Sequence, residues 1–259
     1  MAGEFRIGEK VLLVDNKERR YLITLTEGGE FHSHTGLIPH AEIAGRPEGT
    51  VFRSSRGSRF MAFRPRLDDF VLKMPRGAQV IYPKDLGPLL LLADIHPGVR
   101  VVESGVGSGA LSMAMVRAGA DVTGYELRED FAARAEANVG GFLGEDVMSR
   151  YRVELRNCYD GIDEVDVDRV VLDLPEPWQV IKHAERALRP GGLFVAYTPT
   201  IVQAAHLRDA FETSRFVLAE TLEVLHRTWH IEGQSVRPDH RMVAHTGFLT
   251  SARLLAAQE

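Results

Sequence analysis

The sequence predicts an α/β protein built on a doubly wound, mostly parallel sheet, and three observations carry this prediction. The stretch Val101–Glu126 reads as a buried strand, a glycine-rich loop, a helix and a second strand. Beyond it, strand-like apolar runs alternate with helix-like runs to the end of the chain. Polar side chains follow several of these strands, which is where parallel α/β sheets bind their ligands.

The glycine-rich loop is the centre of the predicted site. It reads Gly105-Val106-Gly107-Ser108-Gly109 and leads into a helix that begins at Ala110. Glycines permit a tight turn and let backbone N–H groups approach a ligand at the N-terminus of a helix. Glu126 lies 21 residues beyond Gly105, at the end of the second strand, where a carboxylate can accept both hydroxyls of a ribose. We therefore expect a nucleotide-containing cofactor rather than a glycine-rich turn without a ligand.

The loop by itself leaves two cofactors open. Gly105, Gly107 and Ala110 also satisfy the fingerprint of NAD-binding proteins. Two features favour S-adenosylmethionine. Glu103 ends the first strand, where it could hold the ammonium group of the methionine, and the proline-containing run Asp173–Trp178 follows a later strand.

The composition is that of an ordinary globular protein. The 259 residues, 44% hydrophobic and 26% charged, suit one large α/β domain with a small additional one. The single cysteine, Cys158, excludes an intramolecular disulfide and a multi-cysteine metal site. No apolar run approaches the length of a membrane span and no signal peptide is visible, so we expect a cytoplasmic protein without a membrane partner.

Residues 1–66 are expected to form a small β-rich domain, a compact barrel or curled sheet. The strands that we expect in it are Val11–Val14, Tyr21–Leu25, Thr50–Phe52 and Arg59–Phe63. Three histidines gather in this part of the sequence, His32, His34 and His40. We expect no metal there, because the neighbouring residues do not complete a recognisable ligand pattern.

Residues 67–98 are expected to connect this domain to the cofactor site. Leu67–Met74 reads as a helix, and Asp85 as the cap of a second helix, Leu86–Ala93. The polar, turn-rich run between them leads directly into the glycine-loop domain. We expect it to lie across the cofactor mouth, with Gln79 against the cofactor, although a plain interdomain loop is the alternative.

Residues 99–259 are expected to form the cofactor-binding domain. Strands are expected at Val99–Val102, Asp121–Tyr125, Tyr151–Leu155, Arg169–Leu172, Leu193–Tyr197, Phe216–Arg227 and Gly247–Leu255. Helices are expected at Glu129–Val139, Gln179–Leu188 and Gln203–Phe211. Since the carboxyl ends of parallel strands meet at one edge, polar residues that follow them should converge. The cofactor residues that we assign are Gln79, Glu103, Gly105, Val106, Gly107, Ser108, Gly109, Ala110, Glu126, Asn157, Cys158 and Asp173.

A basic segment interrupts an otherwise acidic chain. The net charge of −5 argues against nucleic acid, but residues 53–76 contain seven basic and two acidic side chains. Such a local excess of +5 is compatible with docking one phosphate backbone. We assign Arg53, Arg56 and Arg59 to RNA binding, and a salt-bridged surface is the alternative on charge alone.

Asp173 is the candidate for the chemistry. It ends a buried strand and opens a run whose prolines stiffen a loop beside the cofactor. A methyl sulfonium is a strong electrophile, so alignment is the main requirement. If the acceptor is N1 of adenine, its lone pair is free, and a carboxylate beside the exocyclic amine would stabilise the cation that methylation creates. Trp178 or Tyr82 could pack against the base, whereas Glu176 can be a solvated side chain of the same loop.

At this point the chain resembles a known family over roughly residues 8–256, the tRNA (adenine-N1) methyltransferases that modify adenosine 58 of the T-loop. The motifs that carry the resemblance are Tyr21–Thr24, Arg76–Asp85, Glu103–Gly109, Asp173–Trp178 and Arg237 with His245–Leu249. The last of these is absent from generic methyltransferases. The resemblance implies a Rossmann-like class I methyltransferase domain, a small N-terminal β-domain, S-adenosylmethionine as cofactor, tRNA as substrate and a homotetramer. It also implies that Asp173 is catalytic and that Tyr82 belongs to the target-base site.

Two departures and several alternatives remain. The loop opens Glu-Ser-Gly where many members have Glu-Ala-Gly, and Asn157 stands where an aspartate often contacts the adenine. The motifs look most like the archaeal-type branch, some members of which methylate adenosine 57 as well as 58. A methyltransferase acting on another nucleic-acid adenine and an NAD-dependent oxidoreductase are the competing enzymes. A non-catalytic tRNA-binding subunit should have lost the glycine loop and Asp173, and this chain retains both.

Overall fold

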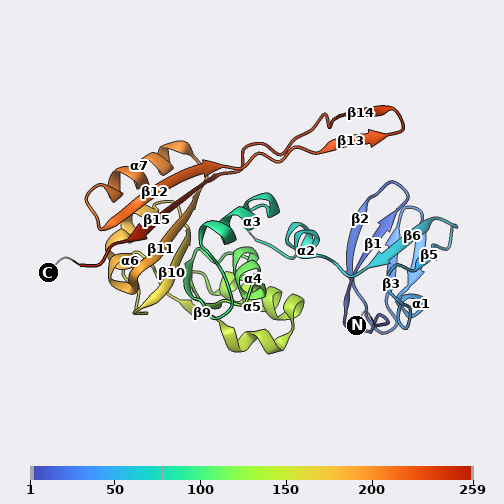
Figure 1. Cartoon of the computed structure of the whole chain (residues 1–259). Helices are drawn as coiled ribbons and strands as arrows, with labels where there is room; N and C mark the ends of the chain where they lie inside the picture. Colours follow the sequence, from blue (N-terminus) through green and yellow to red (C-terminus); the bar gives the residue numbers. More distant parts are fainter. Residues whose placement is uncertain (1–2, 78, 258–259) are drawn as a thin grey trace. The chain divides into compact units, whose positions relative to one another are not determined.

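The structure is a computed structural model that describes residues 3–77 and 79–257, and it divides the chain into two compact units, residues 1–74 and 75–259 (Figure 1). The boundary lies inside the segment 67–98 that the sequence suggested as a connection. That segment is therefore shared, with its first helix in one unit and its second helix in the other.

The first unit is built on a four-stranded antiparallel sheet with the strand order β2-β1-β6-β5. These strands are β1 (Lys10–Asp15), β2 (Arg20–Thr24), β5 (Val51–Arg53) and β6 (Arg59–Phe63). A separate hairpin, β3 (Glu30–Ser33) and β4 (Gly36–Pro39), leads into the short helix α1 (His40–Ile43). The core beneath the sheet is aromatic and aliphatic, with Phe31, Phe60 and Tyr21 in edge-to-face contact.

Helix α2 (Leu67–Lys73) belongs to this first unit because its side chains are anchored there. Asp69 accepts a hydrogen bond from Arg20 of β2 at 2.6 Å, and Phe70 is fully buried. Lys10 of β1 lies over the ring of Phe70, 5.6 Å from its centroid. The helix is therefore tied to the β-unit by an ion pair and by apolar burial.

The second unit contains a seven-stranded sheet with the order β12-β15-β11-β10-β7-β8-β9. Its strands are β7 (Arg100–Ser104), β8 (Asp121–Glu126), β9 (Tyr151–Leu155), β10 (Val167–Asp173), β11 (Leu188–Thr198), β12 (Phe216–Glu223) and β15 (Phe248–Leu254). β15 runs antiparallel to both of its neighbours, and the remaining pairings are parallel. The predicted mostly parallel sheet is thus confirmed, and its order reverses between β7 and β10.

Helices cover both faces of this sheet (Figure 1), as a doubly wound fold requires. One face carries α3 (Pro83–Leu92), α4 (Ala110–Arg117) and α5 (Glu129–Leu143), which continues into a 3₁₀ turn at Glu145–Arg150. The other face carries a 3₁₀ turn at Pro177–Val180, α6 (Ile181–Ala187) and α7 (Ile201–Phe211). Within the described residues, no helix has the length and apolar character needed to cross a membrane.

The predicted cap of α3 was wrong. The helix begins at Pro83 with Tyr82 at the N-cap, because proline needs no hydrogen-bond partner for its nitrogen in the first turn. Asp85 lies inside that turn and is fully buried. Its carboxylate accepts hydrogen bonds from Lys84 Nζ at 2.8 Å and from Thr246 Oγ1 at 2.6 Å. Asp85 therefore joins the helix to a distant part of the chain.

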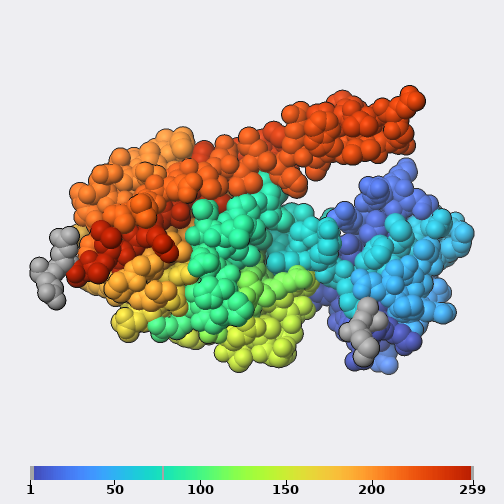
Figure 2. All heavy atoms as spheres, viewed as in Figure 1, coloured from blue at the N-terminus to red at the C-terminus, as the bar shows by residue number. Residues whose placement is uncertain are grey.

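A ribbon that the sequence did not predict projects from the second unit. The expected strand Phe216–Arg227 ends at Glu223, and residues 224–247 run outward and back. The ribbon contains the antiparallel pair β13 (Trp229–Glu232) and β14 (Ser235–Pro238), and Figure 2 shows it as a slender projection. Its root is fastened by Lys84, which donates to the carbonyl of Val224 at 2.7 Å, and by the Asp85–Thr246 hydrogen bond.

Candidate active site

The glycine loop lies between the ends of β7 and β10, where the strand order reverses. Gly105 has a φ of +84°, and a side chain there would collide with the backbone carbonyl of Asp173. Glycine at this position therefore lets two neighbouring strand ends approach each other. Gly107 also has a positive φ, +55°, but the nearest atom to its missing side chain is 3.9 Å away. The open space at Gly107 is where a ligand can approach the backbone.

Two small hollows meet at Gly105. One is lined by Gln79, Val80, Ile81, Gly105, Val106, Gly107, Ser108, Ala110, Leu111 and Asp173. The other is lined by Ser104, Gly105, Tyr125, Glu126, Leu127, Arg156, Asn157, Cys158, Tyr159 and Leu174. The structure thus brings together most of the residues that the sequence assigned to the cofactor, including Gln79 from the segment before α3.

Two residues that the sequence assigned to the cofactor, Glu103 and Gly109, line neither hollow. Gly109 is the N-cap of α4, with a φ of +82°. Glu103 is 1% exposed and lies in β7, two residues before Gly105. Both support the loop from beneath.

Glu126 is held by backbone N–H groups. Its Oε2 accepts a hydrogen bond from Gly107 at 3.0 Å, and its Oε1 accepts from Leu127 and Arg128 at 2.8 and 3.1 Å. A carboxylate has about four acceptor positions, so capacity remains for a further donor. The bond to Gly107 ties the end of β8 to the glycine loop, which places this carboxylate beside the open backbone.

Burial raises the pKa of two carboxyl groups at this edge. The pKa of Glu103 is raised to about 8, mainly by burial, with the negative charges of Asp173 and Glu126 adding to the effect. Burial also raises the pKa of Asp173 to about 7. Burial thus disfavours ionisation of Glu103 and Asp173, and a cationic ligand would relieve that cost.

Buried polar atoms without partners gather at the same edge. Among the described residues, five buried side-chain atoms lack a hydrogen-bond partner: Glu103 Oε1, Ser108 Oγ, Arg156 Nε, Thr198 Oγ1 and His40 Nε2. Four of them are in or beside the carboxyl ends of the large sheet, and His40 is in the first unit. Native proteins rarely leave such groups unsatisfied, and the exceptions tend to mark ligand sites.

Asn157 and Cys158 line the second hollow and are already engaged by the protein. The Asn157 side-chain oxygen accepts a hydrogen bond from the backbone of Tyr159 at 3.1 Å, which leaves one acceptor position. Cys158 is 2% exposed, and burial raises the pKa of its thiol to about 11. The cysteine is therefore a neutral, space-filling group at physiological pH.

The two aromatic residues expected at a target base occupy different environments. Tyr82 is the N-cap residue of α3 and is half-buried. Trp178 packs against the core, and its ring meets His206 edge-on with centroids 5.3 Å apart. Neither residue lines the two hollows. Glu176 is exposed and accepts a hydrogen bond from Gln179 at 2.6 Å.

The basic segment 53–76 separates into two kinds of arginine. Arg64 is paired with Glu9 and Glu48, and Arg66 with Asp68 and Asp69. By contrast, Arg53 and Arg56 donate to backbone carbonyls, of Gly57 and His34. Arg53 and Arg59 stand directly opposite each other on β5 and β6, both exposed. The charge count of the sequence therefore overstated the free positive charge, since Arg64 and Arg66 are paired with acidic side chains, whereas Arg53, Arg56 and Arg59 gather at this β5–β6 turn.

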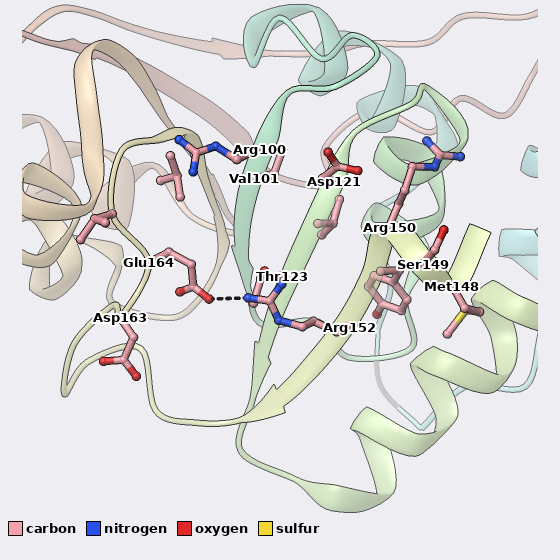
Figure 3. A pocket seen from close by; sticks show the side chains of 14 residues that line it. Arg100, Val101, Asp121, Thr123, Met148, Ser149, Arg150, Arg152, Asp163 and Glu164 are labelled. Carbon is pink, nitrogen blue, oxygen red and sulfur yellow. Dashed lines mark hydrogen bonds and ion pairs between the residues drawn. The ribbon is translucent and has the colours of Figure 1, made fainter. Parts of the chain in front are cut away.

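A further cavity lies at the opposite, amino end of the sheet (Figure 3). It has a volume of about 640 Å³. Most of its charged groups have a partner: Arg152 pairs with Glu164 at 3.0 Å, and Arg150 donates to the carbonyl of Val116. Asp163 is paired with Arg156. In the part of the chain that the structure describes, no group of three metal-ligand residues lies close enough to hold a metal ion.

Sequence reasoning missed two supporting residues and the fastening of the ribbon. Ser112 and Tyr151 are buried residues of α4 and β9 that form a hydrogen-bonded chain to Glu103. Lys84 has a nearly buried side chain bonded to Asp85 and to the root of the ribbon. Polar residues in otherwise apolar runs are the signal that could have identified Ser112 and Tyr151.

The fold and the glycine loop define a Rossmann-like methyltransferase. An S-adenosylmethionine-dependent O-methyltransferase of Thermotoga maritima superposes with a TM-score of 0.93 at 33% identity, covering 100% of this chain and 97% of the other. The tRNA (m1A58) methyltransferase TrmI of Aquifex aeolicus superposes with a TM-score of 0.86 at 28% identity, covering 98% and 100%.

The chain belongs to the family described as tRNA methyltransferase complex GCD14 subunit, whose profile matches residues 60–246, and a TrmI-like N-terminal profile matches residues 3–52. It is 38% identical to the tRNA (adenine(58)-N(1))-methyltransferase TrmI of Thermus thermophilus, covering 94% of this chain and 96% of that one. It is 33% identical to the corresponding enzyme of Methanocaldococcus jannaschii, named for adenines 57 and 58, over 94% of each chain. The resemblance inferred from the motifs is confirmed.

Proposed function

We propose that this protein transfers a methyl group from S-adenosylmethionine to N1 of adenine 58 in the T-loop of tRNA. Relatives that match nearly the whole chain are named for this reaction. The observation on this chain that carries the proposal is the set of unpartnered buried polar atoms along the carboxyl edge of the sheet, which includes Glu103 and Ser108 beside the glycine loop. It marks a ligand site at the strand ends where this cofactor is expected.

The residues of the carboxyl edge fit the cofactor. Glu103 Oε1 and Ser108 Oγ are orphaned buried atoms, and the backbone at Gly107 is open. We assign Glu126 to the ribose hydroxyls, Glu103 to the ammonium group, and Asn157 with Cys158 to the adenine. The remaining cofactor contacts are assigned to Gln79, Gly105, Val106, Gly107, Ser108, Gly109, Ala110 and Asp173.

Binding should open this edge. The two hollows measure about 20 and 60 Å³, whereas ligand pockets usually measure about 300–1,000 Å³. Gln79, Val80 and Ile81 line the first hollow opposite the glycine loop. We infer that this segment moves away to admit the cofactor and then closes over it, which would exclude water from the reacting centre.

Asp173 supplies the chemistry expected of the protein. The cofactor, when bound, provides a methyl group on a positively charged sulfur. Asp173 accepts a hydrogen bond from the exocyclic amine of adenine and stabilises the positive charge that develops on the ring as N1 is methylated. Tyr82 and Trp178 are assigned to the flat faces of the base. Since N1 is hidden in a Watson–Crick pair, the base must be presented unpaired.

The β5–β6 turn of the first unit is the proposed RNA contact. Arg53 and Arg59 face each other across the two strands, an arrangement of like charges that costs free energy in the absence of an anion. Arg56 lies in the turn between them. A phosphate backbone would remove this repulsion, and Lys and Arg contacts to phosphates are the usual source of RNA affinity.

We also propose a homotetramer, and the ribbon supports an assembly. Trp229, Ile231 and Val236 on β13 and β14 are 57%, 72% and 60% exposed. A two-stranded ribbon is at most marginally stable by itself, and exposed apolar side chains of this size favour contact with another protein surface. A second copy of the chain is the proposed partner.

Two other acceptors are open to test. The Thermotoga maritima relative is named an O-methyltransferase, and the Methanocaldococcus jannaschii relative acts on adenine 57 as well as 58. An oxygen acceptor would need a base to remove its proton, whereas N1 of adenine does not. Methylation of another nucleic-acid adenine and NAD-dependent oxidation are weaker alternatives.

One experiment separates these outcomes. The protein is incubated with an unmodified tRNA transcript and S-adenosylmethionine, and the methylated nucleosides are mapped by mass spectrometry. We expect N1-methyladenosine at position 58, and a transcript with guanosine at 58 should receive no methyl group there. Methylation of a ribose or phosphate oxygen, or of no position in tRNA, would overturn the proposal, and product at 57 would extend it.

A further inference from the structure

Only one of the two carboxyl oxygens of Glu103 has a hydrogen-bond partner. It is 1% exposed at the end of β7. Its Oε2 accepts a hydrogen bond from Ser112 Oγ at 2.6 Å, and its Oε1 is buried without a partner. Of the residues that the structure describes, none forms an ion pair with this carboxyl group. The two oxygens of one side chain are therefore in different states.

Glu103 Oε2 is the last acceptor in a buried chain of hydrogen bonds. Tyr151, 3% exposed at the start of β9, donates its hydroxyl proton to Ser112 Oγ at 3.2 Å. Ser112, fully buried in α4, then has its own proton directed at Glu103. Three elements, β9, α4 and β7, thus fix one orientation of the serine hydroxyl.

The direction of this chain decides where a proton can reside on Glu103. Since Oε2 is occupied as an acceptor, the proton of the neutral carboxyl group must be on Oε1. The groups that influence Glu103 from neighbouring strands are Asp173 and Glu126, both acidic, and burial holds the pKa of Glu103 at about 8. Burial raises the pKa of Tyr151, and the negative charges of Glu103 and Glu136 raise it further. The Tyr151 hydroxyl therefore keeps its proton and remains a hydrogen-bond donor.

We propose that Ser112, oriented by Tyr151, is a positioning residue that makes Glu103 Oε1 the single atom at which a proton is exchanged for the ammonium group of the cofactor. This inference rests on the proposed S-adenosylmethionine site. When the cofactor binds, the O–H bond at Oε1 breaks, the proton passes to the buffer, and the ionised carboxylate receives the ammonium group. Oε2 keeps its bond to Ser112 throughout.

The test compares two ligands across pH 6 to 9 by calorimetry. S-adenosylhomocysteine carries the ammonium group, whereas 5′-methylthioadenosine has the same adenosine and thioether without it. Below a midpoint near pH 8, the affinity for S-adenosylhomocysteine should fall about tenfold per pH unit relative to that for methylthioadenosine. Titration of Asp173 affects both ligands through the adenosine and thioether that they share. That effect therefore cancels in the ratio of the two affinities.

Three variants locate the effect. Ser112→Ala should move the midpoint upward by about one pH unit, because the ionised carboxylate loses a donor. Tyr151→Phe should move it in the same direction by less. Glu103→Gln should make the ratio of affinities independent of pH. Proton release, measured in buffers of different ionisation enthalpy, should follow the same midpoints.

The outcomes distinguish this inference from the proposed function. If both ligands bind and Ser112→Ala lowers the melting temperature without moving the midpoint, Ser112 is merely structural and the inference is overturned. A pH-independent ratio in the wild type overturns it as well, while leaving the cofactor site intact. If neither ligand binds the wild-type protein, the proposed function fails, and this inference fails with it.

Discussion

The two ends of the seven-stranded sheet differ in a way that cavity size does not reveal. The amino end holds a cavity of about 640 Å³ in which most charged side chains have a partner, such as Arg152 with Glu164 and Arg150 with a backbone carbonyl. The carboxyl end holds hollows of about 20 and 60 Å³, yet four of the unpartnered buried atoms lie there. Unfilled hydrogen-bonding capacity therefore points to the proposed site, whereas volume points to the other end.

The amino-end cavity has a simple structural origin. Residues 156–166, which connect β9 to β10, form turns and extended chain without a helix. They leave part of the sheet thinly covered, and ion pairs such as Arg152–Glu164 bridge the opening. At the carboxyl end the chain instead packs closely around groups that it does not satisfy.

The largest effect is expected from Asp173. Asp173→Ala should lower single-turnover methyl transfer to tRNA by about a hundredfold or more, the usual scale for losing a preorganised electrostatic partner. Asp173→Asn keeps the shape without the charge and should fall between. Since the pKa of Asp173 is raised to about 7, the wild-type rate should increase with pH up to about 7, and the Asn variant should lack that increase. A wild-type rate in the Ala variant would reassign the chemistry to Tyr82 or Glu176.

Glu126 should have the next largest effect. Glu126→Ala removes the acceptor for the ribose and should weaken binding of S-adenosylhomocysteine by about 1–3 kcal/mol. Glu126→Gln keeps one acceptor oxygen and serves as the matched control, with a smaller loss. Calorimetry that finds the same affinity in both variants as in the wild type would remove Glu126 from the site.

The carboxyl edge should also make stability depend on pH. The pKa of Glu103 is about 8 in the folded protein against 4.5 for a glutamate in water, so the folded protein holds more protons than the unfolded chain between these values. The free energy of unfolding should therefore fall as pH rises from about 4.5 to about 8. Glu103→Gln should remove most of that fall in urea denaturation, at about 1.4 kcal/mol for each pKa unit between the two values. Parallel curves for the two proteins would show that Glu103 titrates normally.

The same contrast between free and paired charges applies to the arginines of the first unit. Neutralising Arg56 and Arg59 with glutamine should weaken tRNA binding and reduce the slope of log affinity against log salt by about one per lost phosphate contact. Arg66→Gln is the control, because Arg66 is already paired with Asp68 and Asp69. An equal loss in the control would mean that general charge, rather than the β5–β6 turn, attracts the RNA.

The smallest effect is expected at the amino end. Arg152→Ala breaks exposed pairs with Glu154 and Glu164, which should cost no more than about 1 kcal/mol of stability. The rate of methyl transfer should stay within about twofold of the wild type. If Arg152→Ala lost much of its activity at unchanged stability, the amino-end cavity would have a role in the reaction. The proposed difference between the two ends of the sheet would then be wrong.

Local patterns were sufficient for the glycine loop and the strands around it. Glycines at 105 and 107, an acidic residue after the second strand and buried strands that end in polar residues depend on neighbours in sequence. Because every parallel strand of such a sheet points its carboxyl end to the same edge, the convergence of Glu126, Asn157 and Asp173 could be predicted from topology.

Contacts between residues far apart in sequence could be decided only by tertiary structure. Asp85 was expected to cap a helix, but its partner Thr246 is 161 positions away. The ribbon of β13 and β14 escaped prediction because each strand has only four residues, too few for the alternation of Trp229 and Ile231 with polar neighbours to stand out. The chain from Tyr151 through Ser112 to Glu103 joins three elements whose sequences carry no sign of one another. Side-chain hydrogen bonds depend on distances of a few tenths of an ångström, which packing sets and periodicity does not.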